Sequence, residues 1–204
     1  MARWENERNT GERIRQLKRE AVLREAAHAF GRHGYHNTSL DDVARALNIS
    51  KGTLYNYVKD KQEILFECHK EALDIGDAAV AHASGVTSSG GDQLRVSMLY
   101  YLEHLVEQLG ACAALMDVDA LRPADREAAV HRRAGFERWF VETVERGMAD
   151  GSLRSDLNPR IVLVTFMGAS NWIPRWYKPE GDLKPREVAE QLVGVLIGGV
   201  LPAN

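Results

Sequence analysis

The stretch from Thr38 to Lys61 constrains the fold most, because helix start signals, apolar spacing and turn chemistry meet there. Its first half places apolar residues at i, i+3, i+4 and i+7, which is the spacing of one buried helical face. Ser39 is a favourable N-cap residue, and an acidic residue follows three positions later at Asp42. Asn48 tolerates the left-handed backbone of a tight turn. The pattern predicts two short helices joined at that turn.

The second of these helices, residues 51–57, offers little to a core. Ser50 is its N-cap, and only Leu54 and Val58 are plausible buried residues. A third helix is predicted from Asp60, with Lys61 in its first turn, where a cation suits a nearby phosphate. The remaining side chains of the second helix are of types that contact base edges and phosphates, and they are Lys51, Gly52, Thr53, Tyr55, Asn56 and Tyr57.

These residues carry a family resemblance. Phe30, Gly34 and Tyr35, followed by TSLDDVARALNISKGTLYNYVKDKQEIL, resemble the DNA-binding domain of the TetR family of bacterial transcriptional regulators. The chain departs from the family pattern at Asn48, where glycine is usual, and at Val58, where an aromatic residue is common. The resemblance implies a double-stranded DNA operator as partner, with contacts from Thr38, Ser39, Lys51, Gly52, Thr53, Tyr55, Asn56, Tyr57 and Lys61.

Size and charge agree with a two-part regulator. The chain has 204 residues, of which 45% are hydrophobic and 27% charged, a composition typical of soluble globular proteins. We divide it into a head, residues 1–66, and a body, residues 67–204. The head holds twelve basic and nine acidic residues, whereas the body holds fourteen and twenty. No apolar run approaches the roughly 18 residues of a membrane span, and the charged N-terminus excludes a secretory signal. We expect a cytoplasmic protein with no membrane partner.

The N-terminal residues 1–12 show little periodicity, so we expect a flexible arm there. Arg3, Arg8 and Arg13 are candidates for contacts with phosphates or a minor groove, and a solvated tail is the alternative. From Arg13 to Arg32 a first helix is predicted. Its apolar side, which packs the helix-turn-helix, is expected to consist of Ile14, Leu17, Val22, Ala26, Ala27 and Phe30.

The rest of the chain has the pattern of further helices. We expect a long connecting helix from residue 61 to 83, a loop over 84–91, and a final pair of strongly apolar helices. Two such helices exceed what one small core can cover, so they predict a homodimer through a C-terminal four-helix bundle. The expected fold is all-α, with a three-helix head on a larger helical body. The other predicted helical segments are 92–109, 112–121, 123–150, one that Asn158-Pro159 starts within the stretch 155–177, and 185–201.

An all-helical body builds a ligand pocket between helices from aromatic and a few polar side chains. The segment GASNWIPRWYKPEGDL also resembles regulators of fatty-acid, branched-chain and steroid catabolism that respond to acyl-CoA thioesters. Gly168 stands near where some of those regulators carry an arginine for coenzyme phosphates, and Arg175 or Arg133 are possible substitutes. The candidate effector residues are Tyr101, His104, Met116, Trp139, Phe166, Asn171 and Trp172, the last two being implied by this resemblance.

The sequence contains none of the common hydrolase, metalloprotease, P-loop or Rossmann motifs. The function expected is therefore a repressor released by a small apolar effector such as an acyl-CoA, with no cofactor. A non-DNA helical adaptor and an activator of the same family are the alternatives. An enzyme is a further alternative, and its catalytic site would have to consist of Glu67, Cys68 and His69. A metal site at the histidines near residue 30 lacks a shared ligand face, and Cys68 and Cys112 suggest no disulfide.

Overall fold

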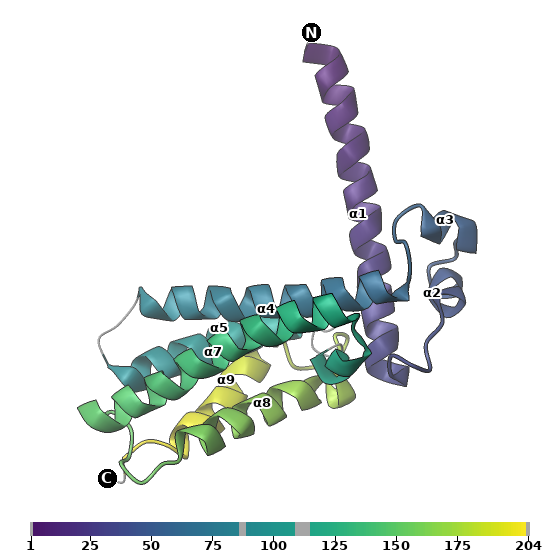
Figure 1. The fold of residues 1–204 in the computed structure, drawn as a ribbon. Helices are drawn as coiled ribbons and strands as arrows, with labels where there is room; N and C mark the ends of the chain where they lie inside the picture. The colour runs from purple at the N-terminus through teal and green to yellow at the C-terminus, as the bar shows by residue number, and fades with distance from the viewer. Residues whose placement is uncertain (1, 86–88, 109–114, 203–204) are drawn as a thin grey trace.

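A computed structural model describes residues 2–85, 89–108 and 115–202, and the side chains of 10–85, 89–108 and 118–202. Every regular element in these ranges is a helix (Figure 1). The all-α class expected from the sequence is confirmed. The elements are α1 Ala2–His33, α2 Leu40–Ala46, α3 Lys51–Tyr55, α4 Lys61–Ser84, α5 Gly90–Glu107, the 3-10 helix η1 Leu115–Ala120, α7 Pro123–Asp150, α8 Pro159–Trp176 and α9 Pro185–Gly198.

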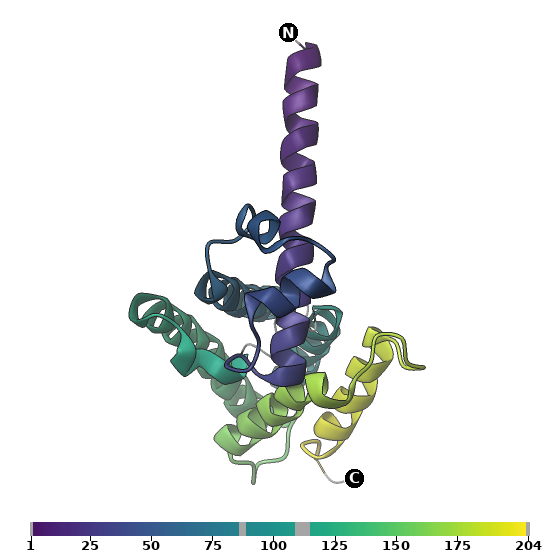
Figure 2. The same ribbon diagram turned by 90° about the vertical axis from the view of Figure 1, so that its right-hand side faces the viewer.

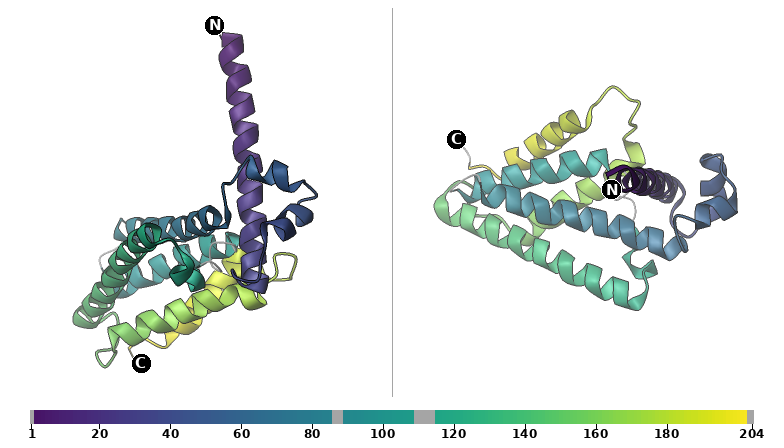
Figure 3. Two further views of the ribbon diagram at one scale, coloured as in Figure 1. Left: turned by 45° about the vertical axis from the view of Figure 1, so that its right-hand side comes forward. Right: turned by 90° about the horizontal axis from the view of Figure 1, so that it is seen from above.

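The helices pack around two apolar cores. Seen from above, α4, α5 and α7 lie side by side, with α2 and α3 beyond one end of them (Figure 3). One core lies among α1, α2, α3 and the first turns of α4, and the other lies among α4, α5, α7, α8 and α9. Cys68 of α4 belongs to the first core and Ala72, one turn later, to the second. Helix α4 therefore connects the two, as the predicted connecting helix should.

Helix α1 is longer than expected. Residues 2–12, predicted as a flexible arm, continue the helix without a break, since no proline interrupts residues 1–33. A side-chain bond from Gln16 Nε2 to Glu20 Oε1 of 3.0 Å spans one helical turn. Ile14 and Leu17, expected in the core, are exposed because burial of α1 begins only at Val22, where the helix reaches α4.

The start of α5 also differs from the expected position. Helix α5 begins at Gly90 rather than at Asp92, because the two glycines of this turn lie directly against the end of α7. A Cβ atom at Gly90 would lie 2.2 Å from the backbone nitrogen of Gly147. The Gly90 amide donates to Asp150 Oδ2 at 2.7 Å. Only residues without a side chain allow the two helix ends to approach this closely.

The two C-terminal helices each leave an apolar side uncovered. Helix α8 begins after its N-cap Asn158, and it continues through Pro174 to Trp176, so this proline falls in the last turn. The face of α8 around Phe166 is buried, whereas Ile161 and Val164 on the other face are exposed. On α9, Val195 is 78% exposed. Val130 of α7 is likewise exposed.

Candidate DNA-binding surface and effector cavity

The turn between α2 and α3 has the local structure that its sequence predicts. The Ser39 hydroxyl accepts from the Asp42 amide at 3.2 Å, and the Asp42 carboxylate accepts from the Ser39 amide at 3.1 Å. This reciprocal pair is a capping box, and it fixes the start of α2. Asn48 has a φ of 53°, the left-handed conformation expected at the turn. The Ile49 amide then bonds to the Ala44 carbonyl at 3.0 Å, which aims the chain into α3.

Helix α3 is anchored from one side and exposed on the other. Ser50 caps it by accepting from the Thr53 amide at 3.1 Å, and Leu54 is completely buried in the head. Tyr55 is 46% exposed. Helix α3 itself lies on the side of the molecule turned toward the viewer in Figure 2, clear of the body helices. The structure keeps most of the predicted base- and phosphate-contacting residues at the surface: Lys51, Gly52, Tyr55 and Asn56 are exposed, and Thr53 and Tyr57 are half-buried.

A surface ion pair holds Lys51 beside α2. Its ammonium lies 2.8 Å from Asp41 Oδ1, and hydrogen bonding to Asp41 raises the Lys51 pKa. Lysine therefore remains protonated at neutral pH, as phosphate binding requires. Both side chains are more than half exposed, so a phosphate oxygen can replace the carboxylate without a large desolvation cost.

Two other residues of the predicted DNA-contacting set have side chains that point inward. Thr38 is only 4% exposed, and its hydroxyl donates to the carbonyl of Gly34 at 2.9 Å. Lys61 donates to the carbonyl of Tyr35, and its ammonium lies 4.0 Å from the centre of that ring. Both side chains thus support the internal structure of the head. Ser39 is exposed, with its hydroxyl engaged in the cap of α2.

Helix α4 joins the head to the body through polar contacts at its beginning. The Asp60 carboxylate accepts from the Glu63 amide at 2.8 Å, and this hydrogen bond keeps the Asp60 pKa below its usual range. Asp60 also pairs with Arg122, which precedes α7. Arg19 of α1 lies 2.9 Å from both Glu63 and Glu67 of α4. A shift of α4 relative to α7 would therefore also displace the helices of the head.

The body contains a narrow cavity among α4, α5, α7 and α8, of about 30 Å³. That volume holds little more than one or two water molecules. We call it the central cavity. Asn171 Oδ1 is buried without a hydrogen-bond partner among the described residues. The lining residues are Ala72, Leu73, Gly76, Asp77, Tyr101, Arg133, Phe136, Met167 and Asn171.

Of the candidate effector residues, Tyr101 and Asn171 line the central cavity. Phe166 is buried against Tyr101, with ring centres 5.5 Å apart, and extends the same aromatic cluster. His104 is directed elsewhere, because its ring stacks on Tyr100 at 4.0 Å. The structure therefore does not bring the candidate effector residues together in one site.

Trp172 does not line the central cavity. It is 62% exposed, because the turn of α8 that buries Ser170 and Ile173 directs position 172 outward. Trp139 is half-buried against the body core. The side chain of Met116 lies outside the described residues.

The effector-residue prediction omitted several cavity-lining residues. Phe136 and Met167 look like any other apolar positions of amphipathic helices, so no local pattern marks them. Gly76 lies in the middle of α4, where a glycine is costly, and this is a sequence signal that could have been used. A Cβ atom there would lie 3.4 Å from the Phe136 ring, so the small residue helps to shape this wall.

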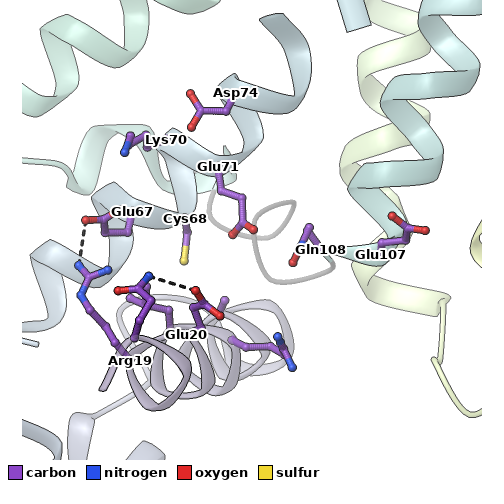
Figure 4. Close-up of a pocket in the computed structure, with 13 residues that line it drawn as sticks. Arg19, Glu20, Glu67, Cys68, Lys70, Glu71, Asp74, Glu107 and Gln108 are labelled. Carbon is purple, nitrogen blue, oxygen red and sulfur yellow. Dashed lines mark hydrogen bonds and ion pairs between the residues drawn. The ribbon is translucent and has the colours of Figure 1, made fainter. Parts of the chain in front are cut away.

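A second, more polar cleft of about 440 Å³ lies between α1 and α4 (Figure 4). Cys68 lies at its base, and the ion pair of Arg19 with Glu67 crosses one end. Burial raises the pKa of the Cys68 thiol to about 12, so the thiol is protonated at neutral pH. His69 is buried and Glu67 is paired with Arg19. The three residues of the enzyme alternative therefore show no activated nucleophile.

A capped helix-turn-helix with an exposed second helix, joined by one long helix to a body with its own cavity, defines a ligand-sensing DNA-binding regulator. Residues 22–68 match the model for bacterial regulatory proteins of the tetR family, and residues 87–200 match a tetracyclin repressor-like C-terminal domain. The second match alone covers more than half of the chain. The chain belongs to the TetR family of transcriptional regulators, which confirms the resemblance seen in its sequence.

Individual relatives agree with this assignment. The chain is 27% identical over 187 residues to the HTH-type transcriptional repressor KstR2 of Mycolicibacterium smegmatis, covering 90% of each chain. The structure of the ketosteroid transcriptional regulator KstR2 of Mycobacterium tuberculosis superimposes with a TM-score of 0.79 at 22% identity, covering 91% of this chain and 96% of that one. AibR, solved in complex with isovaleryl coenzyme A and operator DNA, has the same fold, with a TM-score of 0.66 at 24% identity over 88% of this chain and 97% of that one.

Among the described residues, no helix combines the length and apolar character that a membrane span requires. Within the same ranges, no three histidine, cysteine or acidic side chains gather as a metal site would need.

Proposed function

We propose that this regulator is a dimeric repressor, active in the cytoplasm, that binds a palindromic operator and is released by an acyl-CoA or a similar apolar effector. The observation that carries the DNA part is the geometry of α3. Leu54 fixes the helix to the head, while Lys51, Tyr55 and Asn56 remain exposed. Such a helix, presented twice by a two-fold dimer, fits two successive major grooves. The relatives named as repressors support the direction of the response.

The division into head and body, at residues 66 and 67, is part of this proposal. Its support is the change of core along α4, where Cys68 packs with the head and Ala72 with the body. The separation is incomplete, since Leu121 and Ala129 of the body also pack into the head core. Head and body therefore share an interface that a movement of α4 can transmit.

The dimer is proposed to form through α8 and α9. An apolar groove of about 340 Å³ lies there, and Leu196 and Ile197 of α9 form part of its lining. Exposed Ile161, Val164 and Val195 lie on the same two helices. A second copy with the same face would cover these residues in a four-helix bundle, as a two-fold interface is self-complementary.

The effector is proposed to enter the central cavity. At about 30 Å³ this cavity is far smaller than a ligand site, which usually exceeds about 300 Å³. Binding must therefore separate α4 from α7 or α8, and α4 carries the head. Asn171 supplies an unsatisfied buried acceptor, and Arg133 supplies a cation for an anionic group. The fold relative solved with isovaleryl coenzyme A supports the ligand class.

The difference in binding free energy that the effector must supply between the two conformations is modest. Shifting the two conformations from 1:99 to 99:1 takes about 5.5 kcal/mol of differential binding. A dimer has two cavities, so each needs to supply about half of that.

The DNA part is tested with Tyr55→Ala and Lys51→Ala, using Lys178→Ala on the body surface as the matched control. The probe is the duplex that the wild-type protein selects from a random-sequence library. We expect each head variant to weaken binding about 5- to 30-fold, which corresponds to about 1–2 kcal/mol. Lys178→Ala should bind as wild type. Unchanged affinity in both head variants would remove α3 as the reading helix and favour the adaptor alternative.

The effector part is tested by thermal shift against a panel of acyl-CoA thioesters. A ligand at a hundred times its dissociation constant stabilises the folded state by about 2.7 kcal/mol. We expect one chain length to raise the melting temperature and to release the selected duplex. Arg133→Gln should weaken this response, whereas Arg138→Gln, on an exposed position of α7, should leave it intact. Equal responses of the two variants would place the effector elsewhere.

A further inference from the structure

The cleft between α1 and α4, which we call the α1–α4 cleft, has the size of a ligand site. Its volume is about 440 Å³, whereas the central cavity holds about 30 Å³. Sites that bind small molecules usually enclose about 300–1,000 Å³. The walls come from α1 of the head and from α4 and the end of α5. The proposed effector enters the central cavity instead, so the α1–α4 cleft has no assigned ligand.

The walls of the cleft carry an excess of negative charge. Five acidic and three basic residues line it, a net charge of −2. The acidic residues come from all three helices, and they are Glu20, Glu67, Glu71, Asp74 and Glu107. A cleft lined mainly by one sign of charge concentrates ligands of the opposite sign. The charge therefore favours a cation.

The protein neutralises only part of this charge itself. Arg19 pairs with Glu67, and Asp74 pairs with Arg132 of α7. Glu71 and Glu107 make no hydrogen bond or ion pair within the described part of the chain. These two carboxylates are therefore available to a ligand.

Glu71 has the least favourable surroundings of the cleft carboxylates. Partial burial raises its pKa, and the carboxylates of Asp74, Glu20 and Glu67 add to this effect. Arg24 opposes the shift without forming an ion pair with Glu71. In Figure 4 the carboxylates of Glu20 and Glu71 point into the space between the two helices. A cation placed there would relieve the repulsion between them.

The floor of the cleft is apolar. Leu23 and Ala27 of α1 line it, together with Cys68 of α4. The Cys68 side chain is 3% exposed, and its sulfur points toward α1 in Figure 4. This thiol has no hydrogen-bond partner among the described residues, and a thiol is only a weak hydrogen-bonding group. The floor therefore suits methylene groups rather than a hydrated ion.

We propose that the α1–α4 cleft binds a linear aliphatic diamine or polyamine, with ammonium groups on Glu71 and Glu20 and methylene groups over Leu23 and Ala27. Such a ligand has its charges spread along a chain, as the carboxylates are spread along the cleft. A metal ion fits less well, because no three histidine, cysteine or acidic side chains gather closely in the described ranges. The ligand would contact both α1 and α4, so it should stabilise the packing of the head on the body.

The inference is independent of the proposed function, because it requires neither an operator nor an acyl-CoA. Putrescine and spermidine are therefore titrated into the full chain without DNA, by calorimetry and by thermal shift. We expect saturable binding of one molecule per chain and a higher melting temperature. Magnesium chloride at the same ionic strength tests for general screening. The neutral analogue 1,4-butanediol tests for the charge requirement. Neither should reproduce the stabilisation.

Matched variants locate the site. Glu71→Gln keeps the size of the side chain and removes the charge, so it should weaken spermidine binding about 3- to 10-fold. Glu145→Gln makes the same change on the exposed side of α7, outside the cleft, and should bind spermidine as wild type does. Both are exposed glutamate positions within helices, so far-ultraviolet circular dichroism should be unchanged.

The inference is overturned if neither amine binds saturably, or if Glu71→Gln and Glu145→Gln bind spermidine equally. Equal stabilisation by magnesium would show general screening of an acidic surface, and equal binding of butanediol would show a site without charge selection. Either of these results also overturns it. Operator binding and acyl-CoA release are measured separately, so the proposed function stands or falls on its own tests.

Discussion

Asp60 shows how one residue can serve both local and long-range structure. Its carboxylate caps α4 at the Glu63 amide and pairs with Arg122 of the body. Asp60→Ala removes both interactions, and loss of such a cap costs about 1 kcal/mol of unfolding free energy. Asp60→Asn keeps a capping oxygen and should cost less than alanine. Urea denaturation of the two variants measures the difference.

The pH dependence of this effect has a defined sign. The folded state lowers the Asp60 pKa, so its contribution is present above the ordinary carboxyl pKa and is lost as pH falls through the lowered value. The stability gap between wild type and Asp60→Asn should therefore narrow below about pH 4. A gap that widens on acidification would contradict this assignment.

Cys68 illustrates the opposite case of a buried neutral group. Because burial raises its pKa to about 12, the folded protein keeps the thiol protonated. In a Cys112→Ser background, we expect alkylation by iodoacetamide at pH 8 to be slow in the native state and fast in urea. The same shift predicts that stability falls as pH rises above the ordinary thiol pKa, because the unfolded chain then releases the proton. Rapid native alkylation would show that the α1–α4 cleft opens to Cys68.

At the scale of elements, the contact between α5 and α7 depends on two facing glycines. A Cβ atom at Gly90 would meet the backbone of Gly147 at 2.2 Å, and backbone cannot yield as a flexible side chain does. Gly90→Ala should lower the unfolding free energy by about 1–3 kcal/mol, as overpacked positions do. Gly135→Ala in α7 meets nothing within 4 Å and should instead stabilise by about 0.5–1 kcal/mol. Thermal denaturation of both variants distinguishes the two effects, and equal shifts would contradict the packing argument.

For the whole molecule, the uncovered faces of α8 and α9 predict self-association. Val195→Glu places a charge on the most exposed large apolar side chain of α9. Such a charge, if buried in a dimer, costs several kcal/mol. Sedimentation should therefore show a monomer, and the selected operator should bind more weakly.

Val130→Glu on α7 is the matched control, because it changes the same residue type at an exposed position outside the proposed bundle. It should remain dimeric. A dimeric Val195→Glu variant, or a monomeric wild-type protein, would require another interface.

Much of the fold was accessible from local pattern alone. The caps at Ser39 and Asn158, the left-handed Asn48 and the boundaries Pro123 and Gly151 all depend on residues within one or two turns of each other. Local hydrogen bonds and backbone preferences decide such features, so the sequence shows them directly. The family resemblance followed from the same short stretch.

Other features depended on what each element packs against. The orientation of Thr38, Lys61 and Trp172 is set by neighbours far along the chain or by the packing of a whole helix. The early start of α5 requires Gly147, and the walls of the central cavity come from four separate helices. The amino-acid order determined where helices begin, turn and end, because these choices are made by adjacent residues. Only the tertiary structure decided which side chains face inward, because burial is a property of the assembled helices.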